Sequence, residues 1–216
     1  MFIKYRYINN DKICKSYSFN IVNYDNIIYL ECVGNYILEM PIIPINLINL
    51  NCSNNDLLNL SILSNNLKIL NCKNNKLIYL KFNHLNELYC CKNVLDNLPI
   101  LNNELTIINC SSNKLNNLPI LSNNLIKLYC GFNNIEYITT LPNNLKIFSC
   151  EDNKIVNLPL LPNSLVKLYC SSNKLNKLPK INKYINTIEY YGNIIKFIAI
   201  NNIGLIELEI YYFINF

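Results

Sequence analysis

The sequence predicts a repeat solenoid, in which short similar units stack side by side and each adds one strand to a parallel β-sheet. Three observations predict it. Cysteines recur every 20 residues between Cys32 and Cys170, with one step of 18, and an asparagine follows each of them by three positions. The residues before each cysteine alternate between apolar and polar, which is the period of a strand. Because a single unit cannot bury its own apolar face, we expect the units to stack around a continuous core.

Residues 1–26 are expected to form an N-terminal cap, because the open end of a solenoid exposes its core. Residues 2–8 and 13–19 each alternate between apolar and polar side chains, and a polar stretch from Asn9 to Lys12 separates them. This arrangement is typical of a β-hairpin. We therefore expect a hairpin to cover the first unit.

Nine units follow the cap and occupy residues 27–204. They begin at Ile27, Leu47, Leu67, Leu85, Leu105, Leu125, Leu145, Leu165 and Ile185. Together with the degenerate tenth repeat described below, they predict a parallel sheet of about nine or ten short strands on the concave side, with neighbouring strands ~4.8 Å apart. The unit that begins at Leu67 is two residues short, and residues 81–84 replace its usual connection.

The return segments between the strands are expected to be extended, polyproline-II-like or 3-10 in conformation, with few or no long helices. Proline lacks a backbone donor and pushes the residue before it toward extended geometry. Four return segments carry proline at the same place, at Pro99, Pro119, Pro159 and Pro179.

Residues 205–216 are expected to form a degenerate tenth repeat and C-terminal cap, which lacks the asparagine of the other units. Glu207 and Glu209 are expected to point outward from its strand. Charges on an exposed sheet edge discourage further strand pairing.

The asparagine of each unit is predicted to have a structural task. The chain turns sharply after each strand and leaves backbone groups pointing inward, and an asparagine amide offers both donors and acceptors to satisfy them. We call this series the Asn ladder. It consists of Asn35, Asn55, Asn75, Asn93, Asn113, Asn133, Asn153, Asn173 and Asn193.

The recurring cysteines are predicted to point into the core, because free cysteine behaves as a small hydrophobe. Ten cysteines in a secreted chain would instead suggest a disulfide framework, but eight of them recur in the predicted interior and the sequence shows no secretion signal. Cys14 and Cys91 lie outside the series, and Cys91, in the turn after a strand, is a candidate reactive thiol. We call the series the Cys ladder. It consists of Cys32, Cys52, Cys72, Cys90, Cys110, Cys130, Cys150 and Cys170.

Residues 165–179 read L-x-x-L-x-C-x-x-N-x-L-x-x-L-P. This unit resembles the leucine-rich-repeat family, whose signature is L-x-x-L-x-L-x-x-N/C-x-L, over roughly residues 27–213. The short unit with Leu-Pro resembles the bacterial-type subclass of secreted effectors. Abundant Asn, Ile, Lys and Tyr beside a single alanine indicate AT-rich coding, which also suits proteins of large DNA viruses of amoebae. The resemblance implies a horseshoe that binds other proteins.

Composition argues against nucleic-acid and membrane partners. The net charge is +5, and the lysines are scattered without a run of five or more, so no track for phosphates is indicated. We find neither a signal peptide nor an uncharged apolar run near 18 residues. A soluble intracellular protein is expected, located in the host cytoplasm if it is viral or an effector.

The same residues argue against catalysis, metal binding and cofactors. His84 is the single histidine, and the ladder cysteines are too widely spaced for the clustered ligands of a zinc site. His84 precedes a strand and Cys91 follows it, so the two are expected at opposite strand ends rather than as a nucleophile pair. The four glycines are widely spaced and form no phosphate-binding loop. We therefore expect a protein that is not an enzyme.

The third and fifth residues of each unit are expected to project from the concave face. There, isoleucine and tyrosine alternate between neighbouring units and lysines flank them, which predicts an interaction site. The predicted partner-binding residues are Ile69, Tyr89, Ile107, Lys127, Tyr129, Ile147, Lys167 and Tyr169. Duplication of a two-repeat unit would produce the same alternation without selection for binding.

We therefore expect a non-catalytic protein that binds a protein partner through its concave face. A structural or self-associating role within a larger assembly is the alternative. The sequence identifies neither the partner nor the oligomeric state.

Overall fold

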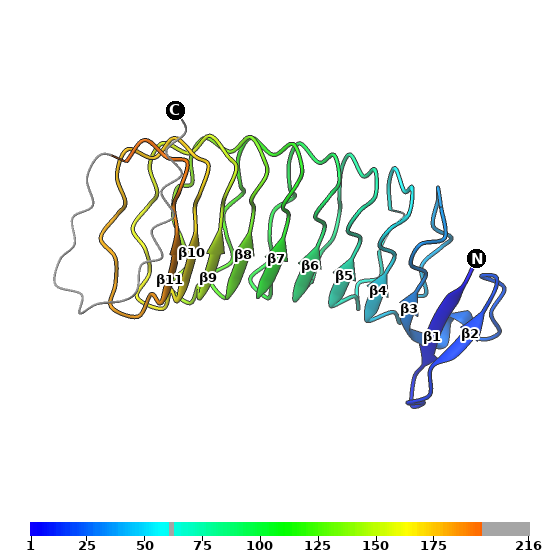
Figure 1. Ribbon diagram of the computed structural model, residues 1–216. Coiled ribbons are helices and arrows are strands. Elements are labelled where there is room, and N and C mark those ends of the chain that lie inside the picture. The colour runs from blue at the N-terminus through cyan, green and yellow to red at the C-terminus, as the bar shows by residue number, and fades with distance from the viewer. Residues whose placement is uncertain (61–62, 196–216) are drawn as a thin grey trace.

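A computed structural model of the chain describes residues 1–60 and 63–195 (Figure 1). The turns of the chain stack one behind another along a single axis, and each turn presents its strand on the same side (Figure 1). The predicted C-terminal cap at 205–216, with Glu207 and Glu209, lies outside the described residues.

The described strands form one sheet of eleven, in the order β11-β10-β9-β8-β7-β6-β5-β4-β3-β1-β2. Strands β3 to β11 are parallel, and each pairs with the strand of the next unit, so the predicted sheet of stacked units is confirmed. These strands are β3 (Ile27–Glu31), β4 (Asn49–Asn51), β5 (Ile69–Asn71), β6 (Glu87–Tyr89), β7 (Ile107–Asn109), β8 (Lys127–Tyr129), β9 (Ile147–Ser149), β10 (Lys167–Tyr169) and β11 (Thr187–Glu189).

The shortened unit leaves the strand register unchanged. Ile69 of β5 pairs with Glu87 of β6, a step of 18 residues, whereas Ile107 of β7 pairs with Lys127 of β8, a step of 20. In both cases the same positions of the two units face each other. The two missing residues are therefore taken from the return segment and not from the strand.

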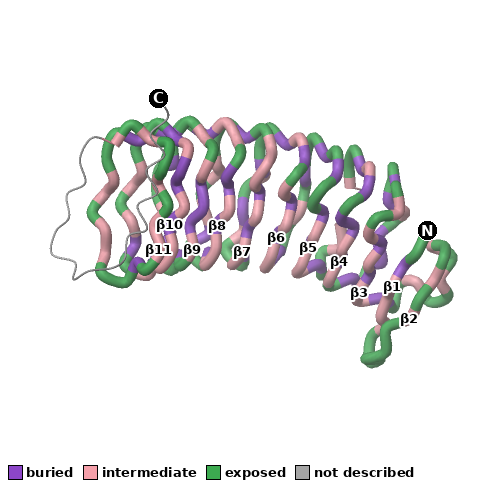
Figure 2. The backbone as a smooth tube through the Cα atoms, viewed as in Figure 1, coloured by how far each residue is buried: buried purple, intermediate pink, exposed green. Residues whose placement is uncertain are grey.

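The core lies between the sheet and the return segments, and buried positions recur in every turn (Figure 2). In most strands the middle residue, such as Leu128 of β8, points inward and is fully buried while its two neighbours are half-buried. The cysteines of the Cys ladder are also fully buried. Phe148 is the largest fully buried side chain and occupies a position that holds leucine in the units on either side.

The Asn ladder joins neighbouring units through side-chain hydrogen bonds. The Nδ2 atom of Asn113 donates to the carbonyl oxygens of Cys90 and Cys110, at 3.1 and 3.0 Å. Its Oδ1 atom accepts from the backbone N–H of Leu95, at 3.0 Å. One side chain therefore satisfies backbone groups of two units. The ladder asparagines from Asn55 to Asn193 make the same kind of contacts.

The residue before each ladder asparagine adopts a left-handed backbone, which the sequence analysis did not anticipate. Glycine occupies this place at Gly34 and Gly192, but Lys92 (φ 55°) and Phe132 (φ 56°) occupy it elsewhere. A side chain in this conformation costs roughly 1 kcal/mol. The conformation turns the chain so that the asparagine reaches inward, and the ladder hydrogen bonds offset the cost.

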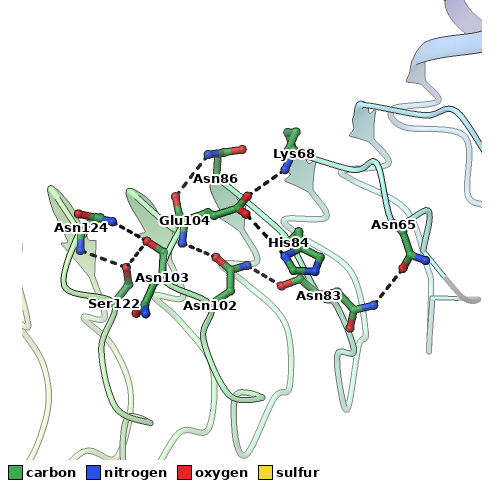
Figure 3. Close-up of polar contacts among 10 residues, drawn as sticks. All are labelled: Asn65, Lys68, Asn83, His84, Asn86, Asn102, Asn103, Glu104, Ser122 and Asn124. Atoms are coloured by element: carbon green, nitrogen blue, oxygen red, sulfur yellow. Dashed lines mark hydrogen bonds and ion pairs between the residues drawn. The ribbon is translucent and has the colours of Figure 1, made fainter.

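A second polar column, also unforeseen, lies where the chain enters each strand. The Nδ2 atom of Asn102 donates to the Asn83 carbonyl at 2.6 Å, and that of Asn124 donates to the Asn103 carbonyl at 2.8 Å (Figure 3). Within the described residues, the return segments contain neither helix nor strand. The described part of the chain contains one 3-10 turn, η1 (Tyr24–Asn26), and no α-helix, in agreement with the expected return side.

The N-terminal hairpin consists of β1 (Ile3–Tyr7) and β2 (Cys14–Ser16), and β1 pairs antiparallel with β3 at the edge of the sheet. The first ladder residue, Asn35, binds the hairpin: its Oδ1 atom accepts from the Phe2 N–H at 2.6 Å and its Nδ2 atom donates to the Phe2 carbonyl at 2.8 Å. Ile3 is fully buried. The hairpin therefore takes the place of a preceding repeat.

Candidate interaction surface on the sheet face

We call the outer side of the sheet, formed in β4 to β11 by the first and third residues of each strand, the sheet face. All eight predicted partner-binding residues lie on it and are half-buried. The first residues of strands β5, β7, β8, β9 and β10 are Ile69, Ile107, Lys127, Ile147 and Lys167, and the third residues of β6, β8 and β10 are Tyr89, Tyr129 and Tyr169.

The strand register arranges these side chains in two rows. In one row Ile147 lies between Lys127 and Lys167. In the other row Ser149 lies between Tyr129 and Tyr169. Large and small side chains thus alternate across β8, β9 and β10, and the small Ser149 leaves space between two rings.

Burial raises the pKa of the three tyrosines Tyr89, Tyr129 and Tyr169 on the sheet face. The pKa of Tyr89 is raised to about 12, first by burial and then by the hydrogen bond of 2.7 Å that its hydroxyl donates to Glu87. The pKa of Tyr129 is raised by burial and by neighbouring Tyr169. Burial, together with Glu189 and Glu151, also raises the pKa of Tyr169. A tyrosine hydroxyl is ordinarily protonated at neutral pH. The raised pKa values extend this protonated state of all three hydroxyls to more alkaline pH.

A hollow of about 350 Å³ lies between Tyr129 and Tyr169. Ser149 forms part of its lining and is only 5% exposed, although it belongs to a position that projects from the sheet in other units. The remaining lining residues are Ile147, Glu151 and Lys167. Part of the sheet face is therefore hollowed and carries apolar, aromatic and charged groups together.

The described residues contain no group of three or more side chains that could hold a metal ion. His84 precedes β6 and Cys91 follows it, so the strand separates them. The Nδ1 atom of His84 instead lies 3.7 Å from Glu104, whose Oε2 atom is 2.9 Å from the Lys68 Nζ atom (Figure 3). These three side chains are exposed to solvent, which screens such pairs, so the cluster contributes little to stability.

The Cys ladder has little capacity for thiol chemistry. Burial raises the pKa of Cys110 to about 12 and that of Cys72 to about 12, so these thiols stay protonated. The off-ladder Cys91 is partly buried, and burial raises its pKa as well, which argues against the reactive role considered for it. All ten cysteines are free, in line with packing rather than disulfide formation.

We predict that the native protein exposes at most two thiols, those of Cys14 and Cys91, to a thiol reagent at pH 8. The ladder thiols are excluded both by burial and by their raised pKa, because the thiolate is the reactive form. Counting labelled sites by mass spectrometry is the measurement, with the guanidinium-unfolded protein, where all ten are expected to react, as the control. Rapid labelling of a ladder cysteine in the native protein would contradict this arrangement.

The comparisons with known proteins agree with the repeat geometry. No protein-family model and no curated protein matches the chain. Among solved structures, YopM from Yersinia enterocolitica WA-314 is similar over 78% of this chain, with 31% identity and a TM-score of 0.77. YopM from Yersinia pestis, a leucine-rich effector protein, is similar over 79%, with 31% identity and a TM-score of 0.75. The chain has the leucine-rich-repeat fold, with units similar to the bacterial type.

The leucine-rich-repeat protein spans only 38% and 51% of those two YopM chains. InlJ from Listeria monocytogenes, whose functional domain includes a cysteine ladder, shares the fold with 23% identity and a TM-score of 0.53, over 78% of this chain and 49% of InlJ. No helix in the described part of the leucine-rich-repeat protein is long and apolar enough to cross a membrane. The resemblance to viral proteins stays a prediction.

Proposed function

We propose that the leucine-rich-repeat protein binds another protein through its sheet face and does no chemistry itself. One observation carries the proposal: half-exposed isoleucines and tyrosines alternate along β5 to β10, and three of them, Tyr129, Ile147 and Tyr169, line a hollow. Contiguous exposed apolar surface is a mark of interaction sites, and tyrosine is enriched in them because it joins a large ring to a polar hydroxyl. Duplication of repeats accounts for the alternation, but each duplicated unit also places these side chains on one continuous face.

The Yersinia pestis structure supports a protein-binding role, since it is described as that of a leucine-rich effector protein. An intracellular partner is part of the proposal. Ten free thiols suit a reducing compartment, where disulfides do not persist.

The test is a double variant, Tyr129→Ser with Tyr169→Ser, used beside the wild type to capture partners from a lysate and then to measure the affinity of a captured partner. Buried interface tyrosines typically contribute 1–2 kcal/mol or more each, so the pair is expected to weaken binding on the order of a hundredfold. An affinity that the double variant leaves unchanged would show that this face is not the site.

A self-associating role is the second candidate, and the return segments supply the observation that favours it. Ile100, Ile120 and Leu160 are 90%, 89% and 85% exposed, which is unusually open for large apolar side chains. Ile100→Ser with Ile120→Ser is therefore the matched control for the tyrosine pair. Sedimentation of the purified protein over a range of concentrations separates the candidates: a monomer that still binds its partner excludes self-association, and an oligomer that the isoleucine pair disperses supports it.

A further inference from the structure

The hollow between Tyr129 and Tyr169 holds a carboxylate, that of Glu151. Glu151 follows β9, and its Oε2 atom accepts a hydrogen bond of 2.6 Å from the Ser149 hydroxyl. Ser149 is almost fully buried, so this bond fixes the carboxylate in the lining of the hollow. Within residues 1–60 and 63–195, Glu151 forms no ion pair with a lysine or arginine.

Gly131, which follows β8, makes room for this carboxylate. A β-carbon at Gly131 would lie 2.7 Å from the Glu151 Cδ atom and 2.8 Å from its Oε1 atom. The equivalent residues of other units include Ser111 and Ser171, which carry β-carbons. Gly131 does not adopt a left-handed backbone. What makes room for the carboxylate is therefore the absence of a side chain at Gly131, and not the conformational freedom of glycine.

Tyr129 and Tyr169 form the two sides of the hollow. They lie on the strands that flank β9, so their backbones are about 10 Å apart, which is two strand spacings. The hydroxyl of Tyr89 donates to Glu87, whereas neither Tyr129 nor Tyr169 has a hydroxyl partner in the part of the chain that the structure describes. The faces of aromatic rings attract cations, and Arg guanidinium groups stack on them.

The charges of the hollow are arranged along the strands. Glu151 lies beyond the end of β9, while Lys127 and Lys167 lie at the starts of β8 and β10. Glu151 follows Ile147 by four residues along the chain, and Ile147 lies level with Lys127 and Lys167 in the sheet. Along the strand direction, Ser149 lies between Glu151 and the level of Ile147. One end of the hollow is therefore negative and lined by rings, and the other end is positive.

We propose that the negative end receives an arginine side chain of the partner protein, with its guanidinium between the rings of Tyr129 and Tyr169 and paired with the Glu151 carboxylate. A planar guanidinium stacks on aromatic rings and donates two parallel hydrogen bonds to a carboxylate, which a lysine ammonium does not do. This inference rests on the proposed function, because it assigns one partner residue to the same face.

The test uses random linear peptides selected against the purified wild-type protein as probes. The selected peptides are expected to share an arginine, and its replacement by citrulline, which keeps the shape but lacks the charge, is expected to weaken binding about tenfold or more. In the variant Glu151→Gln, the difference in affinity between the arginine and the citrulline peptide is expected to disappear. Gly131→Ala, which displaces the carboxylate without altering any charge, is expected to reduce it. Glu136→Gln, on an exposed return segment, is the matched control and is expected to preserve it.

Circular dichroism and thermal unfolding of each variant separate lost binding from lost folding. Peptides that depend on Tyr129 but bind equally well with citrulline, or with lysine in place of arginine, overturn the arginine inference and leave the proposed function standing. If the wild type and Glu151→Gln prefer arginine over citrulline equally, the arginine inference is likewise overturned and the proposed function stands. A selection that yields no peptide sensitive to Tyr129→Ser overturns both proposals.

Discussion

Replacement of Asn113 by alanine is expected to lower the free energy of unfolding by about 3 kcal/mol, because it leaves several buried backbone groups without partners at 1–3 kcal/mol each. The carbonyls of Cys90 and Cys110 and the N–H of Leu95 all bind this one side chain. They belong to two neighbouring units. The loss of this side chain therefore weakens the turn of one unit. It also weakens the contact between two neighbouring units in the middle of the stack.

Urea unfolding followed by circular dichroism measures this loss. Asn116→Ala is the matched control, since Asn116 lies three residues further along the same unit and is exposed; a change within about 0.5 kcal/mol is expected there. Repeat proteins gain stability from the contacts between neighbouring units, so a weakened junction is also expected to broaden the transition or split it in two. Equal midpoints for the two variants would mean that the ladder hydrogen bonds are not stabilising.

Replacement of Phe148 by alanine is expected to cost about 4 kcal/mol, the range found when a buried phenylalanine is truncated and leaves a cavity. Phe148 is fully buried in β9, below the sheet face, and its paired neighbours are Leu128 and Leu168. Phe148 is larger than the leucine that the neighbouring units carry at this position. Neighbouring units can close such a gap only by shifting the strands on both sides of it.

Phe148→Leu is the matched control, because leucine is what the adjacent units carry at this position. We expect it to cost about 1 kcal/mol, since leucine keeps most of the apolar side chain and leaves a much smaller cavity than alanine. The measurement is again urea unfolding, compared at equal protein concentration. If alanine and leucine destabilise equally, the cavity that we infer is filled by relaxation of the stack.

The sequence was sufficient to predict the strands and the turns after them, because each unit repeats the same spacing. A position that recurs in nine units, such as Leu128 of β8, can be assigned to the core with little ambiguity. The left-handed residues were missed because their identities vary from Gly34 to Lys92 and Phe132. The signal was their constant place before the ladder asparagine. The second polar column was missed for a similar reason, although paired asparagines such as Asn102 and Asn103 precede several strands.

The candidate site was only partly predictable. The outward positions of Tyr129 and Tyr169 follow from strand alternation alone. The hollow between them depends on residues that occur once: the buried Ser149, and the contact of Glu151 with Gly131 from the preceding unit. Such contacts between units are invisible to a repeat pattern, which aligns equivalent positions and averages over their differences.

The shortened return segment before β6 has a consequence for how such a protein changes in evolution and for how it can be modified. Residues 81–84 absorb a two-residue deletion while β5 and β6 keep their pairing. Length is therefore free to vary on the return side, where it costs no strand hydrogen bonds. An epitope or a fluorophore-bearing loop inserted at these residues would make the protein detectable in a cell. It would leave the sheet face free to bind a partner.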